Sequence, residues 1–291
     1  RRALVVVQFS ISQILIIGTL IVGSQMDYFY SKDLGFAKDA IITTYLPEND
    51  PAKVSFFRNQ MMSSSLIKDV TFSLSPPRGN SDSYSNFNHP RTESDRDFNA
   101  NFKVVDHRYI DFFELEMLAG RKLREGDSSN YVLINRKVFN LLGMEDPEEA
   151  IGTVFSTGFN GPKKVIGVVE DFHNQSLREK MDYVFLINMP DIFYETSFKF
   201  NTAGNGMGDV QAVLKHFENV WEEVFPEYLF SYNFFDEQLA RTYAEEKRIA
   251  TLFQLFAAIA IFIGCLGLYG LISFIASQRV KEIGVRKVLG E

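Results

Sequence analysis

Few residues in this chain have the types and spacing that chemistry requires. The 291 residues include four histidines, His89, His107, His173 and His216, whose spacing matches no metal-binding pattern. The single cysteine, Cys265, excludes an internal disulfide and a zinc site built from cysteines. The sequence contains no P-loop for the phosphates of ATP. We therefore expect no catalytic residues, no bound metal and no cofactor, and we expect that the chain is not an enzyme.

Three short motifs resemble parts of known sites, and each has a simpler explanation. Asp171-Phe172-His173 looks like part of a catalytic set, but it lies between an apolar strand and a short helix, which favours a capping or turn role. Residues 204–208 (GNGMG) lack the spacing and the acidic residue of a dinucleotide site, so a flexible loop is favoured. Asn174-Gln175-Ser176 matches a glycosylation sequence, a pattern that is common by chance.

The chain is acidic, and its charges are unevenly distributed. The formal net charge is −7, yet basic residues gather at both ends. The region between the ends is therefore more acidic than the whole, and an acidic surface argues against nucleic-acid binding.

The two ends of the chain are apolar runs without charge. Leu4–Ser24 and Ile249–Ser277 each contain no Asp, Glu, Lys or Arg. At 1.5 Å per residue, each run crosses a hydrocarbon core of about 30 Å as a helix. The first run is too long for a signal peptide and has no clear cleavage site before Asp27. We predict two transmembrane helices, at 1–27 and 248–277.

A glycine stripe and the flanking charges refine this prediction. Glycines spaced by three residues are typical of helices that pack closely in lipid, and here they are Gly264, Gly267 and Gly270. Arg1 and Arg2 precede the first run, and basic residues follow the second, which places both termini in the cytoplasm. The middle region would then lie outside. Because the sequence begins and ends close to these helices, we expect it to be a fragment of a longer chain.

The middle region shows strand and helix patterns in both of its halves. A strand at 40–45, a helix at 51–64 that begins with Pro51, and a strand at 70–74 form a β-α-β unit. A second such unit follows late in the chain, with strands at 184–188 and 196–200, a helix at 210–224 and a strand at 229–234. We predict that these halves meet in space as one α/β part.

The residues between these units differ in character. Residues 76–101 are rich in Ser, Asn and Pro, which indicates a loop, or a loop crossed by an edge strand. Further along, the patterns predict strands at 101–105, 131–134, 152–155 and 164–169, a turn after 115–120, and short helices at 109–113 and 136–142. The predicted fold class is α+β: two transmembrane helices flank an outer α/β part built from 28–84 and 183–247, with an inserted α+β subdomain at 85–182.

The last residues, 278–291, carry the most informative pattern. They leave the second apolar run as a basic segment with apolar residues at helical spacing around Gly284. A basic anchor at the membrane surface is the simpler explanation. The apolar positions favour a short helix that docks in a groove of a cytoplasmic partner, and they are Val280, Ile283, Val285, Val288 and Leu289.

Several segments resemble one family, the MacB/FtsX-like permeases of ABC transporters. Residues 279–290 (RVKEIGVRKVLG) resemble the segment that follows the second membrane helix in that family. Residues 112–123 (FFELEMLAGRKL), 165–180 (VIGVVEDFHNQSLREK) and 259–274 (IAIFIGCLGLYGLISF) resemble other parts of it. The first apolar run is similar to the start of the second half of the double-length permeases common in Bacteroidetes.

The resemblance implies a fold and a function. The outer domain would have an α/β porter-like part and an inserted sabre-like part, in a multi-pass protein of the bacterial inner membrane. A partner ATPase would bind and hydrolyse ATP, and the permease would pass the motion outward to export or extract a peptide, an antibiotic or a lipoprotein. Some members control cell-wall hydrolases instead. The residues that would contact the ATPase are Arg279, Lys281, Glu282, Ile283, Gly284, Arg286, Lys287 and Leu289.

Other partners follow from the same resemblance, and two other functions stay open. The partners are membrane lipid, the other permease half or a second protomer, and a periplasmic adaptor or lipoprotein. The main alternative is a two-helix membrane receptor with a periplasmic sensing domain, which would continue into a linker with heptad character instead of residues 278–291. A membrane-anchored hydrolase is disfavoured because no nucleophile and base are paired in the sequence.

Overall fold

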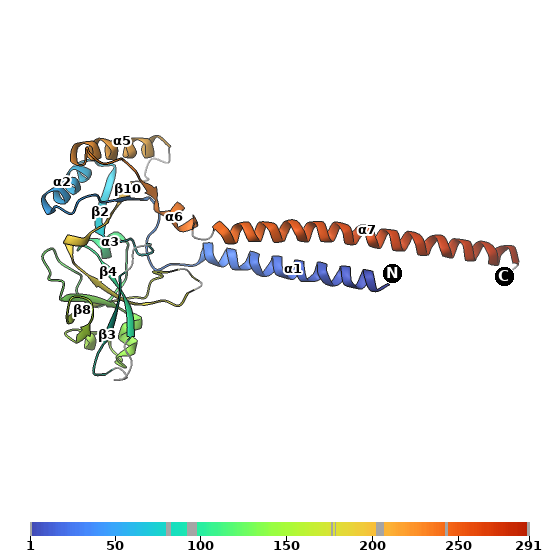
Figure 1. The fold of residues 1–291 in the computed structure, drawn as a ribbon, viewed down its shortest axis with the longest axis horizontal. Helices are drawn as coiled ribbons and strands as arrows, with labels where there is room; N and C mark the ends of the chain where they lie inside the picture. Colours follow the sequence, from blue (N-terminus) through green and yellow to red (C-terminus); the bar gives the residue numbers. More distant parts are fainter. Residues whose placement is uncertain are drawn as a thin grey trace. The chain divides into compact units, whose positions relative to one another are not determined.

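The computed structural model describes residues 2–79, 83–91, 98–175, 177, 179–201, 207–241 and 244–289. The chain divides into two compact units (Figure 1). The first unit consists of residues 1–32 and 242–291, and the second of residues 33–241.

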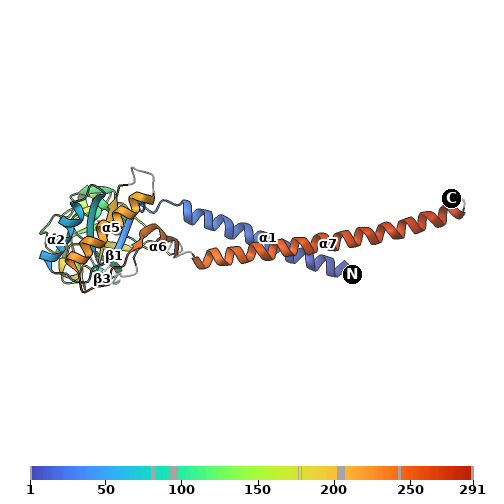
Figure 2. The same cartoon turned by 90° about the horizontal axis from the view of Figure 1, so that it is seen from above.

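The first unit is a pair of long helices. Helix α1 spans Arg2–Ser31, and α7 spans Ala244–Leu289, which is 46 residues or about 70 Å of helix. The helices run antiparallel, because Ser12 of α1 lies beside Ala260 of α7 and Gly18 lies beside Phe253. Figure 2 shows the two helices crossing, with the N and C marks toward the same side of the picture and α7 extending past the end of α1.

The second unit contains a four-stranded antiparallel sheet with the order β11-β1-β10-β2. Helix α2 (Pro51–Met62) joins β1 to β2, and α5 (Met207–Val224) joins β10 to β11. Each helix connects two strands that have a third strand between them, so two split β-α-β units interlock. The two halves predicted to meet in space therefore form one sheet. Its strands are β1 (Ile41–Tyr45), β2 (Ile67–Ser73), β10 (Glu195–Phe200) and β11 (Asn233–Phe234).

An aromatic core holds α2 and α5 on this sheet (Figure 1). Helix α2 begins where predicted: Asp50 accepts a hydrogen bond from the Ala52 N–H at 2.8 Å, and Pro51 is the first helical residue. Phe57 of α2 is fully buried. Its ring packs within 6.4 Å, between ring centroids, of Phe72, Phe217, Trp221 and Phe225.

The remaining strands form a seven-stranded sheet that closes on itself. The order is β5-β8-β6-β9-β4-β3-β7, and β7 pairs again with β8, which makes a six-stranded ring with β5 attached. Buried phenylalanines fill the ring, among them Phe87, Phe102, Phe155 and Phe185. Its strands are β3 (Ser83–Asn88), β4 (Phe98–Val104), β5 (Met117–Gly120), β6 (Tyr131–Asn135), β7 (Val154–Thr157), β8 (Lys163–Val169) and β9 (Tyr183–Ile187).

Short helices lie between strands: α3 (Tyr109–Phe112), α4 (Arg136–Leu141) and the 3-10 turns Pro147–Ala150 and Pro190–Ile192. Helix α6 (Phe235–Arg241) follows β11 and precedes α7. Helix α4 ends as the sequence predicts, because Gly143 adopts a positive φ of 65° after it. An isolated bridge between Ser73 and Val105 joins the two sheets.

The structure differs from the predicted elements in four places. The predicted strand at 229–234 is reduced to Asn233–Phe234 and leads into α6, because Phe235 and Leu239 bury one face of a helix. Residues 115–120, expected only to lead into a turn, contain a strand, β5, at Met117–Gly120. Strand β3 is paired on both sides instead of lying at an edge. Strand β9, expected in the second α/β half, pairs with β4 and β6 in the larger sheet.

The aromatic core under α2 yields a matched pair of variants. Phe57→Ala should lower the free energy of unfolding by about 3–5 kcal/mol, because it opens a cavity among four rings. Phe56→Ala, at the neighbouring position with 43% exposure, should change it by less than about 1 kcal/mol. Urea unfolding of the detergent-solubilised chain, followed by the fluorescence of its single tryptophan, Trp221, measures both. Equal effects of the two variants would contradict this core.

Candidate functional site

The predicted partner-docking segment is part of α7. The helix continues without a break from Ala244 to Leu289, so residues 278–289 share one backbone with the apolar run before them. Arg279 is exposed, and Val280 is 70% exposed. The side chains of Lys281, Glu282, Ile283, Arg286, Lys287 and Leu289 lie outside the described residues, as does Gly290, and the docking role of these residues and of Gly284 stays a prediction.

The contact between α1 and α7 is lined by small residues. Ala250, Ala257 and Gly264 are buried on α7 at a spacing of seven, which places them on one stripe of the helix. The Ser12 hydroxyl of α1 donates a hydrogen bond to the Ala260 carbonyl at 3.5 Å. Small residues let the two backbones approach closely.

One residue of the predicted glycine stripe lies at the contact between α1 and α7. It is Gly264, whereas Gly267 and Gly270 are exposed. A Cβ added at Gly264 or Gly270 would meet no atom within 4 Å in the part of the chain that the structure describes. Gly264 and Gly270 therefore leave open space in the described structure, and the helix-packing role of the three glycines stays a prediction.

One helix of the described chain is long and apolar enough to cross a membrane. It is Lys247–Ser277 within α7, and a shorter apolar stretch, Ser10–Gln25, lies in α1. The predicted span at 248–277 thus has the required length and composition. The predicted span at 1–27 stays a prediction.

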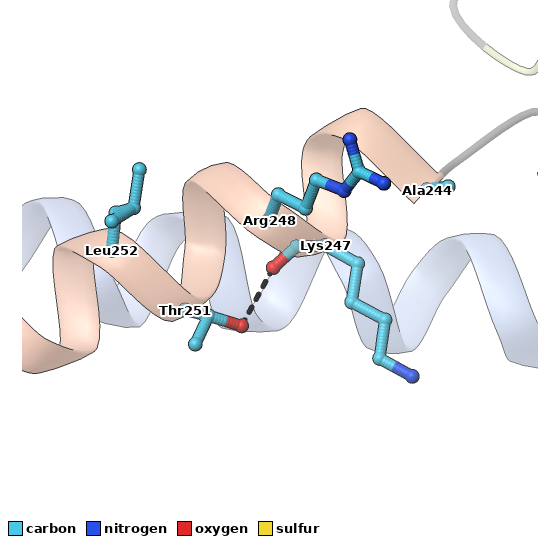
Figure 3. A pocket seen from close by; sticks show the side chains of 5 residues that line it. All are labelled: Ala244, Lys247, Arg248, Thr251 and Leu252. Atoms are coloured by element: carbon cyan, nitrogen blue, oxygen red, sulfur yellow. Dashed lines mark hydrogen bonds between the residues drawn. The ribbon is translucent and has the colours of Figure 1, made fainter.

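Two basic residues, Lys247 and Arg248, lie at the start of the apolar part of α7. Figure 3 shows Lys247 and Arg248 beside Thr251 and Leu252, which with Ala244 line an open groove of about 630 Å³. The Thr251 hydroxyl donates a hydrogen bond to the Lys247 carbonyl at 2.8 Å. The groove lies along a single helix and offers little enclosure to a small ligand.

The motifs with a possible chemical role are built into the fold. Asp171 accepts hydrogen bonds from Asn135 Nδ2 at 2.8 Å and from the Lys137 N–H at 2.9 Å, so its carboxylate serves the first turn of α4. Phe172 is buried in the core. Asn174 is 1% exposed and donates to Asp182 Oδ2 at 2.9 Å, a burial that excludes glycosylation of the folded chain. The cluster at 204–208 lies largely outside the described residues.

The histidines are not brought together. His89 packs against Phe155, and His216 Nε2 lies 3.2 Å from the Met61 carbonyl. His107 lines a cleft, and the His173 N–H donates to the Leu34 carbonyl. Among the residues that the structure describes, no three His, Cys, Asp or Glu side chains are grouped to hold a metal ion.

A small cleft, which the sequence did not reveal, lies between α2 and the loops that contain residues 106–107, 125–126 and 188–193. Its volume is about 150 Å³, and Arg58, Asp106 and His107 are among its lining residues. Asp106 is buried and bonded to the Arg58 guanidinium, to the Thr71 hydroxyl at 2.5 Å and to the Phe72 N–H at 3.1 Å. Burial raises the pKa of the Asp106 carboxyl, and these three donors oppose the rise.

The face of the four-stranded sheet opposite α2 and α5 is polar but buried. In the strand register, Thr43, Ser197 and Thr71 lie side by side, and Glu195 lies opposite Ser73. The hydroxyls of Ser73 and Ser197 find no hydrogen-bond partner among the described atoms. We call this face the polar seam; its residues are Thr43, Thr71, Ser73, Glu195, Ser197 and Lys199.

Within the polar seam, the group whose pKa is shifted from its ordinary value is the carboxyl of Glu195. Burial raises its pKa to about 7, against the opposing effects of a hydrogen bond with Thr43 and of the charge of Lys103. Lys103 is itself buried and donates to Ser75 Oγ at 3.3 Å. The seam therefore contains a carboxyl group that changes charge near neutral pH.

Several solved structures are similar to the chain, and three of them are described below. No protein-family model and no curated protein sequence matches it. The periplasmic region of MacB from Actinobacillus actinomycetemcomitans is 16% identical, with a TM-score of 0.47 over 70% of this chain and 92% of that one. The extracellular domain of the noncanonic ABC-type transporter YknZ from Gram-positive bacteria is 15% identical, with a TM-score of 0.45 over 66% and 97%. A domain of a protein described as a permease from Porphyromonas gingivalis is 14% identical, with a TM-score of 0.42 over 65% and 89%.

The Glu195 carboxyl predicts a pH-dependent stability. Its folded pKa of about 7 exceeds the ordinary value of 4.5, so the folded state binds more protons between these values and stability falls as pH rises through this window. Glu195→Gln should remove that fall, which amounts to about 3 kcal/mol at most by pH 8. Urea unfolding of both proteins between pH 4.5 and 8 measures the difference.

A matched control separates this effect from general titration. Glu227→Gln changes an exposed glutamate and should leave the pH profile of the wild type unaltered. If the Glu195→Gln and wild-type profiles stay parallel across this pH range, Glu195 does not titrate as stated.

Proposed function

We propose that the chain belongs to the permease subunit of an ABC transporter in a bacterial inner membrane. Residues 33–241 form its periplasmic domain, and both termini lie in the cytoplasm. The resemblance of residues 279–290 and of three further segments to that family supports the assignment.

The observation that carries the proposal is the continuity of α7. One helix contains the apolar stretch Lys247–Ser277 and the basic, amphipathic residues that follow it to Leu289. An α-helix of this kind transmits tilt and rotation along its axis, because each turn is hydrogen-bonded to the next. A plain anchor needs only the apolar stretch, whereas a rigid extension with apolar and basic faces suits docking to a protein.

The proposed mechanism assigns the chemistry to a partner. An ATPase subunit binds and hydrolyses ATP, and residues 278–289 dock on it without taking part in catalysis. Its conformational change displaces α7 relative to α1, and residues 33–241 follow because both helices are joined to them. The displaced domain moves a peptide, an antibiotic or a lipoprotein by mechanotransmission, together with the other permease half or a second protomer and with a periplasmic adaptor or lipoprotein.

A docking variant tests the proposal. In the full-length permease with its ATPase, combining Gly284→Pro and Arg286→Glu should reduce stimulation of ATP hydrolysis at least tenfold. Proline in a helix interior costs about 3 kcal/mol, and the glutamate reverses a charge that would face the partner. The purified complex in lipid nanodiscs, tagged on this chain, yields the ATPase rate and the amount of bound ATPase.

Two controls make the result specific. Gly284→Ala keeps the helix and should retain stimulation. Arg248→Glu reverses a charge on the same helix at the other end of the apolar stretch, and it should also retain stimulation. Undiminished stimulation in the double variant would contradict docking through this segment. A heptad linker and signalling domain downstream would favour the receptor instead.

A further inference from the structure

The chain enters and leaves residues 33–241 through one apolar cluster. Residues 33–37 follow α1, and α6 precedes α7, so these two segments are the covalent connections of the domain. Both contribute buried side chains to the same cluster, which is separate from the core under α2 and α5. We call this whole cluster the connector cluster, and its members at or against the two connections include Leu34, Phe36, Phe113, Phe172, Phe235 and Leu239.

The incoming connection fits closely on the loop that follows β8. Gly35 has a φ of +77°, and a Cβ there would lie 3.0 Å from the Asp171 carbonyl and 3.2 Å from Phe172 Cα. The carbonyl of Leu34, the residue before Gly35, accepts a hydrogen bond from the His173 N–H at 2.9 Å. Only glycine allows both this backbone conformation and this approach.

Two further contacts fix the same segment. The Ala37 N–H donates to the Phe113 carbonyl at 2.8 Å, which ties the connection to the residue after α3. The Gly35 N–H donates to Asp33 Oδ1 at 2.9 Å, which closes the turn. The segment after α1 is therefore bonded to two different parts of the domain within five residues.

The outgoing connection is held by aromatic rings. Phe235, the first residue of α6, is fully buried. Its ring centroid lies 6.0 Å from that of Phe36 and 5.9 Å from that of Phe113. The two connections thus contact each other directly through Phe36 and Phe235.

The cluster rests on the outside of the six-stranded ring. Leu133, Ile166 and Leu186, from β6, β8 and β9, belong to it. Their neighbours in sequence, such as Val132, Val165 and Phe185, point to the other core. A force on the connections is therefore applied to these three strands and to the loop at 171–173.

We propose that the connector cluster is a mechanical clamp, which delivers a change in the spacing of α1 and α7 to the seven-stranded sheet through residues 171–173. Gly35 is a positioning residue, because it allows the incoming segment to lie on that loop. The inference deepens the proposed function, since it names the part of the periplasmic domain that responds to the helices.

The test joins α1 to α7 by a disulfide and measures hydrogen exchange in the loop that contains residues 171–173. In a Cys265→Ser background, Ser12→Cys and Ala260→Cys place two thiols at the α1–α7 contact, where oxidation joins them. Hydrogen exchange of the full chain in nanodiscs, measured by mass spectrometry, compares the oxidised and reduced forms. We expect a change of at least threefold in the exchange rate of peptides containing residues 171–175, and none in peptides of α2.

Matched glycine variants show whether the clamp carries the effect. Gly35→Ala should abolish the response to oxidation. Gly161 also has a positive φ, +82°, but a Cβ added there would meet no atom within 4 Å. Gly161→Ala therefore introduces a similar backbone strain without a clash, and this variant should retain the response to oxidation. If Gly35→Ala does not fold, as judged by Trp221 fluorescence, Phe235→Leu replaces it with the same expected loss.

Two results would overturn the clamp: an unchanged exchange rate at 171–175 on oxidation, or a response that persists in the clamp variants. The experiment contains no ATPase and no nucleotide. It therefore fails or succeeds independently of docking by residues 278–289, and the two proposals are distinguishable.

Discussion

The uninterrupted backbone hydrogen bonding of α7 is the constraint on which the other features depend. Because the helix runs from Ala244 to Leu289 without a kink-forming proline, its two ends cannot move independently. The small residues at the contact with α1 keep a second helix close along part of this length. In the proposed mechanism, a displacement at one end of α7 would become a displacement of both helices at the other end, where the chain joins residues 33–241.

The domain combines apolar cores with one polar sheet face. Interlocked split β-α-β units and a closed ring of strands, both filled with phenylalanine, resist deformation because close-packed cores do not deform continuously. The polar seam differs, since hydroxyls and the side chains of Glu195 and Lys199 replace apolar contacts on one face of the four-stranded sheet. The connector cluster lies next to this seam through Ile41 of β1.

Local signals in the sequence predicted much of this fold. The pairing of strands that are far apart in the sequence could not be predicted from such signals. Asp50 and Pro51 mark the start of α2, and Gly143 marks the end of α4, because caps are local. The run YVFLI of β9 is apolar on both faces, so its pattern does not say which sheet it joins. In β10, polar residues at 195, 197 and 199 alternate as on an exposed strand, yet Ser197 and Lys199 are buried and Glu195 is half-buried. The segment at 278–289 came from sequence resemblance, and its partner contacts stay a prediction.

The central claim is tested most directly by finding on which side of the membrane residues 33–241 and the end of α7 lie. In a Cys265→Ser background, Leu229→Cys reports on the domain, with 94% exposure, and Val280→Cys reports on the residues after the apolar stretch. A membrane-impermeant maleimide applied to intact spheroplasts should label Leu229→Cys and should label Val280→Cys only after the membrane is opened. Labelling of both positions in intact spheroplasts, or of neither, would contradict an α7 that joins a periplasmic domain to a cytoplasmic docking segment.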